Sequence, residues 1–163
     1  MVKTYSIRFP IIFILVSICV FLFGASDASA ELTKQEIQRI APKLSAAINR
    51  VIEKHQGGIE LREKAIRRLS ECSTITGIMS KQKGDAETNA RLWSFANLYL
   101  EVSVLLASEI SLDRYKQIVD VAHDTVMKMP ERNDKKELFL LLKNCKSFTD
   151  PEEIENALME LTL

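Results

Sequence analysis

Two cysteines have the surroundings for covalent chemistry, Cys72 in the stretch LSECSTITG and Cys145 in LLKNCKSF. Such a pair can form a disulfide, bind a metal ion, or supply one nucleophile beside an inert thiol. Both fall on the apolar face of a predicted helix, which argues against an exposed nucleophile. A disulfide is the favoured interpretation, with two buried free thiols as the alternative. Zinc binding is poorly supported because the chain has no Cys-x-x-Cys and no paired histidine spacing.

The two histidines are the other candidates for acid–base or metal chemistry. His55 is predicted in the last turn of a helix, just before Gly57, where a cation interacts favourably with the helix dipole. Asp120 and Asp124 flank His123, a pattern that the exposed face of an amphipathic helix also produces. The chain has no G-x-S-x-G, H-E-x-x-H, P-loop or glycine-rich dinucleotide motif. We therefore expect no enzyme activity, no catalytic residue, no metal and no cofactor.

Three aromatic residues, Trp93, Phe95 and Tyr99, form the candidate surface for a partner or ligand. Aromatic side chains anchor protein interfaces and line apolar pockets. Packing in the core is the favoured explanation for the same residues. The helix predicted to carry them, 86–109, is apolar on nearly every side, which is typical of a central buried helix. A strip of such a helix can also stay exposed and serve for dimerisation or docking.

The elements that position these residues are all predicted to be helices, because proline and glycine are scarce after residue 30 and apolar residues recur at spacings of three and four. The six expected helices are one from the Thr33–Glu36 capping box to Gly57-Gly58, a second from Ile59 that weakens at STIT and Gly77, a third over 86–109, a fourth from the Ser111 cap to Pro130, a fifth with Leu138 to Cys145, and a sixth opened by Asp150, Pro151 and Glu153. Pro42 is expected to kink the first helix or to start a second piece of it. The predicted fold class is therefore all-α, a compact bundle of about six helices with the apolar third helix as its axis.

A disulfide would constrain this bundle. Cys145 is predicted at the end of the fifth helix and Cys72 towards the end of the second, and these ends lie at opposite poles of an up-and-down bundle. Bridged cysteines need Cα atoms within about 7 Å. Either the second helix continues past STIT and places Cys72 at mid-height, or the helices cross obliquely.

The first thirty residues have the pattern of a secretory signal peptide, with basic residues, an apolar run over 11–25 and an Ala28-Ser29-Ala30 cleavage site. The run is shorter than the roughly 20 residues of a transmembrane helix. Cleavage after Ala30 leaves a single domain, 31–163, that is periplasmic or secreted and matures where thiols oxidise. An uncleaved leader would attach the domain to a membrane.

The charge of the predicted mature domain is balanced, since 20 basic and 21 acidic residues remain after residue 30. A balanced domain gives no electrostatic case for nucleic acid or anionic lipid as a partner. We expect the partner to be a protein.

The layout resembles the amidase immunity proteins, small periplasmic helical proteins that protect bacteria from peptidoglycan amidases delivered by type VI secretion. The shared features are the N-terminal signal, Cys72 late in an early helix, the segments LYLE and RYKQIVD, and Cys145 in LLLKNCKSF before an acidic last helix. The resemblance spans about residues 60–160, although no aromatic residue follows Cys72 closely and the long first helix is extra. It implies a homodimer that inserts a loop into the cleft of a cognate enzyme, with the loops 81–85 and 130–136 as the places to look.

The function expected from the sequence is protein–protein binding by an exported, non-enzymatic helical protein of the bacterial envelope, acting as an immunity-type inhibitor if the resemblance holds. The alternative is a carrier of an apolar small molecule in the same compartment, with Trp93 and its neighbours lining the cavity. A signal-anchored protein and a hydrolase are the remaining alternatives.

Overall fold

The computed structural model describes residues 32–82, 84–132 and 135–162, so the predicted leader lies outside the described residues. The elements of the described part are α2 (Lys34–Lys54), α3 (Gly58–Met79), α4 (Ala86–Leu106), the 3-10 helix η1 (Ala107–Glu109), α5 (Leu112–Arg132), α6 (Lys135–Ser147) and α7 (Ile154–Met159). No strand occurs in these ranges. The all-α bundle predicted from the sequence is confirmed.

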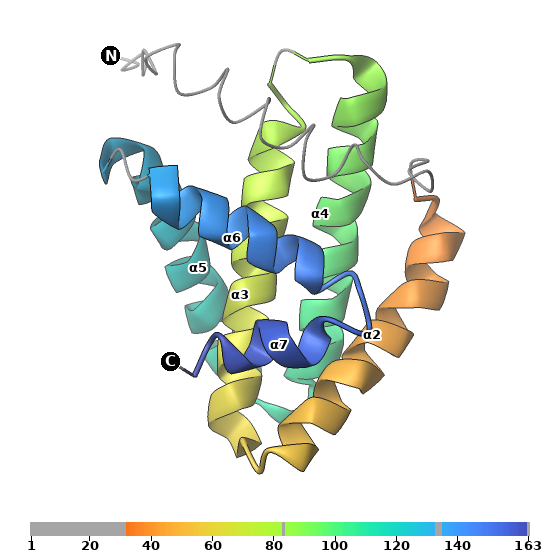
Figure 1. Ribbon diagram of the computed structural model, residues 1–163, viewed down its shortest axis with the longest axis vertical. Helices are drawn as coiled ribbons and strands as arrows, with labels where there is room; N and C mark the ends of the chain where they lie inside the picture. The colour runs from red at the N-terminus through yellow and green to blue at the C-terminus, as the bar shows by residue number, and fades with distance from the viewer. Residues whose placement is uncertain (1–31, 83, 133–134, 163) are drawn as a thin grey trace.

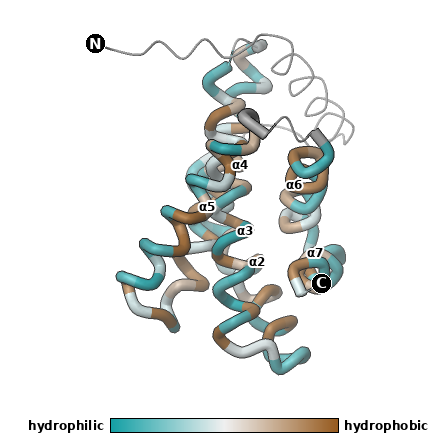
Figure 2. Tube along the Cα trace, turned by 90° about the vertical axis from the view of Figure 1, so that its left-hand side faces the viewer, coloured by the Kyte–Doolittle hydropathy of each residue, from teal (hydrophilic) through white to brown (hydrophobic). Residues whose placement is uncertain are grey.

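The helices form two layers. In the first layer α2 packs against α4, α4 against α3, and α3 against α5. Helices α6 and α7 lie across one face of this layer (Figure 1) and appear beside it in the side view (Figure 2). Because α3 packs against α2, α4, α5 and α6, the centre of the fold is α3 and not the apolar α4 that the sequence predicted as the axis.

Helix α3 continues without a break through the STIT segment to Met79, although β-branched residues were expected to weaken it there. The hydroxyl of Thr76 donates to the carbonyl of Cys72, one turn earlier (2.7 Å), and the hydroxyl of Ser73 donates to the carbonyl of Ala96 on α4 (2.9 Å). Their polar groups are thus satisfied inside the bundle, and Ile75 and Met79 are buried there. The helix therefore continues past STIT and places Cys72 well inside α3, which is the first of the two geometries that a disulfide required.

Helix α2 also continues without a break, through Pro42. The predicted capping box is present, because the Thr33 hydroxyl accepts from the Glu36 amide while the Glu36 carboxylate accepts from the Thr33 amide. A proline inside a helix costs about 3 kcal/mol. Burial of the α2 stripe, which includes Leu44 and Ile48, offsets this cost.

Two boundaries near the C-terminus differ from the sequence prediction. Helix α5 does not end at Pro130 but reaches Arg132, because burial of Val126 and Met129 holds its last turns on the core. The last helix begins at Ile154 and not at Asp150, since the Asp150 carboxylate caps a separate turn by accepting from the Glu152 amide (3.0 Å).

Candidate functional site

The cysteine pair is a disulfide that joins the two layers. Cys72 of α3 and Cys145 of α6 are bonded with their Cα atoms 5.5 Å apart, and both are fully buried. The hydroxyl of Tyr99 on α4 donates to the carbonyl of Cys145 (2.9 Å), so α6 is tied to both central helices at one point. The predicted disulfide is confirmed. Since both sulfur atoms are in the bond, neither acts as a nucleophile or a metal ligand here.

The three aromatic residues predicted as a binding surface do not lie together. Tyr99 is only 1 % exposed and belongs to the core, and Phe95 is half-buried, packs on that core and stacks on Tyr99 with ring centroids 6.3 Å apart. Trp93 is 49 % exposed on another side of α4. Of the three, Trp93 alone presents a large surface to a partner.

Two residues that the sequence did not single out extend the surface of Trp93. Leu100 and Val104 are 45 % and 48 % exposed, and they follow Trp93 by seven and eleven positions. These spacings place all three on one face of α4. We call them the α4 strip. The spacing was readable in the sequence, but a helix that is apolar on every side gives no sign of which face stays uncovered.

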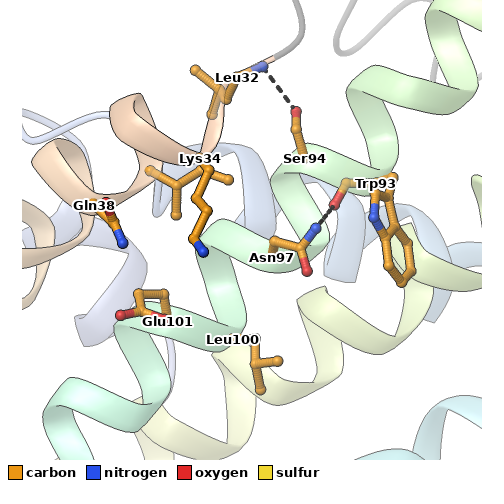
Figure 3. A pocket seen from close by; sticks show the side chains of 9 residues that line it. Leu32, Lys34, Gln38, Trp93, Ser94, Asn97, Leu100 and Glu101 are labelled. Carbon is orange, nitrogen blue, oxygen red and sulfur yellow. Dashed lines mark hydrogen bonds between the residues drawn. The ribbon is translucent and has the colours of Figure 1, made fainter.

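A groove of about 450 Å³ runs between α2 and α4 beside this strip (Figure 3), and we call it the α2–α4 groove. Its lining residues are Leu32, Lys34, Ile37, Gln38, Trp93, Ser94, Asn97, Leu100 and Glu101. Lys34 extends from the α2 side towards α4, whose side of the groove carries Glu101, so the two walls bear opposite charges (Figure 3). The amide of Leu32 donates to the hydroxyl of Ser94 (3.2 Å) and joins the two walls at one end.

The indole of Trp93 is supported from below and from one side. A Cβ atom built on Gly77 of α3 would lie 4.0 Å from Cζ3 of Trp93, so the ring rests over the glycine backbone. The ammonium of Lys81 lies 5.9 Å from the ring centroid, within the range of a cation–π interaction. An aromatic side chain held in this way loses little conformational entropy on binding, which favours its use as an anchor.

The histidines lie away from the groove. His55 caps the C-terminus of α2, and its Nε2 lies 2.7 Å from a carboxylate oxygen of Glu155 on α7, to which Lys54 also donates (2.7 Å). The bond from Lys54, then that from His55, lowers the pKa of Glu155. This cluster fastens α7 to α2, so the predicted structural role of His55 takes the form of an inter-helix contact. His123 is exposed on α5.

Of the two predicted loops, 81–85 is tied by hydrogen bonds and 130–136 is mostly helical. In the first, the Asp85 carboxylate caps α4 by accepting from the Thr88 amide (2.7 Å), and Asn89 donates to the Gln82 carbonyl (3.2 Å). A hydrogen bond with the Thr88 side chain, and then the bond with the Thr88 backbone, lowers the pKa of Asp85. The prediction of a second loop over 130–136 is wrong for most of that range, because α5 continues to Arg132 and α6 begins at Lys135. Residues 133 and 134 lie outside the described residues.

Within the described ranges, no three His, Cys, Asp or Glu side chains are grouped so as to hold a metal ion. None of the helices described is both long and apolar enough to cross a bilayer. Comparisons with protein-family models, with curated proteins and with solved structures found no match to this chain. The resemblance to amidase immunity proteins therefore stays a prediction, and a functional assignment must come from the surface of the molecule.

Proposed function

We propose that this chain is an exported, non-enzymatic protein that works by binding another protein through the α4 strip and the α2–α4 groove. The observation that carries the proposal is the exposure of Trp93, Leu100 and Val104 on one face of a single helix, each close to half exposed. Scattered single apolar residues on a surface need no explanation, but an aligned set beside a groove is typical of an interaction site.

The chemistry of this face favours a protein over other partners. Its apolar part is anchored by tryptophan, the residue type most enriched among side chains that dominate interface energies. Lys34 and Glu101 supply one charge of each sign at its edge, together with the amides of Gln38 and Asn97. A polar rim around an apolar centre is the usual anatomy of a protein–protein interface.

The dimensions of the strip suggest how a partner would bind. The eleven positions from Trp93 to Val104 span about 16 Å along α4. A partner helix laid in the α2–α4 groove would need about three turns to cover this distance, with apolar residues at i, i+4, i+7 and i+11 facing the strip. The opposite charges of Lys34 and Glu101 would fix its direction, because charged groups at an interface contribute more to orientation than to affinity.

Envelope location and an immunity-type role are parts of the same proposal. The signal-peptide pattern of residues 1–30 supports export, and the disulfide supports an oxidising compartment. For an inhibitor of an amidase, the α4 strip is a better candidate for the contact surface than the loops, because the first predicted loop is tied by hydrogen bonds and most of the second is helical.

The test is affinity capture from an envelope extract with variants of the strip. The double variant Leu100→Gln, Val104→Gln should lose the captured protein and keep its fold, because both side chains are already about half exposed. The matched control is Leu112→Gln, Met127→Gln, which removes two apolar side chains of α5 that are somewhat more exposed (66 % and 50 %). Capture that is equal in all three proteins would contradict the proposal.

The carrier of an apolar small molecule remains a second candidate, because the groove volume of about 450 Å³ falls within the usual range of ligand sites. The charges of Lys34 and Glu101 in the lining argue against a purely apolar cargo. Organic extraction of the purified protein, followed by mass spectrometry, distinguishes the two. A stoichiometric lipid that disappears in the Leu100→Gln, Val104→Gln variant would favour the carrier.

A further inference from the structure

A second exposed surface, on α6, differs in chemistry from the α4 strip. Its outward side chains are Lys136, Phe139, Leu140, Lys143 and Lys146, all exposed, and we call them the α6 face. Phe139 and Leu140 are 43 % and 52 % exposed. The inward side of the same helix carries Leu141, Leu142 and Cys145, which are buried. The α6 face is therefore the solvent side of an amphipathic helix that keeps two large apolar residues among three lysines.

The position of α6 leaves this face open. Helices α6 and α7 form the outer layer over α2–α5, and none of the other described elements covers the outer side of α6 (Figure 2). From Lys136 to Lys146 the face spans about 15 Å along the helix. A flat partner could therefore contact its full length.

The charge of the α6 face is not neutralised within the described residues, since none of its three lysines forms an ion pair there. The helix contains one acidic residue, Glu137, which is half-buried. Two carboxylates of the following segment bind residues at the end of α6, since Glu153 accepts from Ser147 (2.7 Å) and Glu160 accepts from Asn144 (3.1 Å), whereas Glu155 binds Lys54 and His55 on α2. The cationic part of the α6 face is therefore its three exposed lysines, none of which these carboxylates pair with.

We infer that the α6 face docks on a bilayer surface that carries anionic headgroups. Phe139 and Leu140 enter the boundary between headgroups and acyl chains, and the lysines keep their ammonium groups at the level of the phosphates. Lysine close to an anionic bilayer contributes through electrostatic attraction that needs no fixed geometry. Lysine is depleted at protein–protein interfaces, and the α6 face carries three lysines. Of the residue types enriched at such interfaces, the face has one phenylalanine, Phe139, and no arginine, tyrosine, tryptophan or methionine. The composition therefore favours lipid over an acidic protein.

This inference is independent of the proposed function, because the two surfaces lie on different helices and make different use of charge. The α4 strip belongs to the first layer of helices, and the α6 face belongs to the outer layer (Figure 1). A bilayer bound by the α6 face would then hold the described domain near its partner.

The test is sedimentation of the purified full chain with vesicles of phosphatidylcholine, alone or with 30 mol % phosphatidylglycerol. Intact mass first establishes whether residues 1–30 are present, because an apolar leader binds vesicles of both kinds. The triple variant Lys136→Gln, Lys143→Gln, Lys146→Gln removes the charge of the face. Its matched control, Lys43→Gln, Lys116→Gln, Lys128→Gln, removes the same charge from exposed sites on α2 and α5. Far-UV circular dichroism checks that every variant keeps its helices.

The expected result is a partition coefficient on anionic vesicles that falls about 100-fold in the α6 triple variant and much less in the control. Binding of the wild-type chain to anionic vesicles should weaken as the salt concentration rises, because salt screens the lysines. The variant Phe139→Ser, Leu140→Ser should lose the vesicle binding that remains at high salt. Equal binding to neutral and anionic vesicles by a chain without its leader would overturn the inference. So would equal losses in the two triple variants. Absence of vesicle binding, with α6-dependent binding to an acidic helical peptide, would assign the face to a protein instead.

Discussion

Opening the Cys72–Cys145 disulfide is expected to lower the free energy of unfolding by about 4 kcal/mol. The two residues are 73 positions apart, and for a loop of this length the chain-entropy relation gives about 4 kcal/mol at 25 °C. Domains of this size are stable by about 5 to 15 kcal/mol, so a large share of the total depends on one bond. For about 130 ordered residues the unfolding entropy converts this loss to a fall of about 15 °C in Tm.

The assay is thermal unfolding followed by circular dichroism, with and without a reductant, on protein whose free thiols are counted by alkylation and mass. The variant Cys72→Ala, Cys145→Ala is the control, since reductant should not change its Tm. A reduced protein with both thiols alkylated and a Tm within about 3 °C of the oxidised form would refute the entropic reasoning.

The structure also predicts where the reduced protein opens first. The disulfide and the Tyr99 hydroxyl hold the end of α6 against the first layer, and the Glu155 cluster holds α7 against α2. Hydrogen exchange should therefore rise in α6 before it rises in α3, which is covered by four helices. Uniform loss of protection along the chain would mean that the two layers unfold as one unit.

Three further predictions concern single residues. Gly77→Ala should stabilise the protein by about 0.5 to 1 kcal/mol in urea denaturation, because glycine is costly inside a helix and the new Cβ would make ordinary contacts at 3.8 Å and beyond. A lower stability would mean that α3 cannot hold a larger residue at this point. Tyr99→Phe should cost about 1 kcal/mol, because the buried carbonyl of Cys145 loses its hydroxyl donor, and an unchanged stability would show that bond to be inert. The pKa of Glu155 is lowered, first by Lys54, so its contribution to the free energy of unfolding should be present above its usual pKa of 4.5 and be lost as the pH falls through the lower value in the folded protein. Stability measured against pH for the wild type and for Glu155→Gln should show the difference between them shrinking only in that acidic range. A difference that persists under strong acid would contradict the assignment.

The helices could be predicted from the sequence because their apolar spacing and caps are local. The Thr33 capping box and the Ser111 cap both hold in the structure, the latter by accepting from the Arg114 amide (3.2 Å). The weakening expected at STIT and the helix end expected at Pro130 do not occur, because burial and side-chain hydrogen bonds outweigh the local preference. Such bonds depend on neighbours that a single-sequence pattern does not contain.

The candidate surface could be predicted only in part, for a reason that lies in α4 itself. A helix with apolar residues on every side gives the same periodicity whether it is covered on three sides or on four. Trp93 and Tyr99 therefore looked alike in the sequence, although one is half exposed and the other donates its hydroxyl bond inside the core. The order of packing, α2 beside α4 beside α3, decides which side is left open.

The most direct measurement of the central claim, that the α4 strip is covered by another protein, is site-specific photo-crosslinking in intact cells. A photoreactive amino acid at Leu100 should give one adduct of defined mass, while the same group at the exposed Gln117 of α5 should give none. The adduct should weaken when Val104 is replaced by Gln, because the change lies on the same strip. A position 100 that crosslinks to no protein, or that gives the same adducts as position 117, would contradict the account.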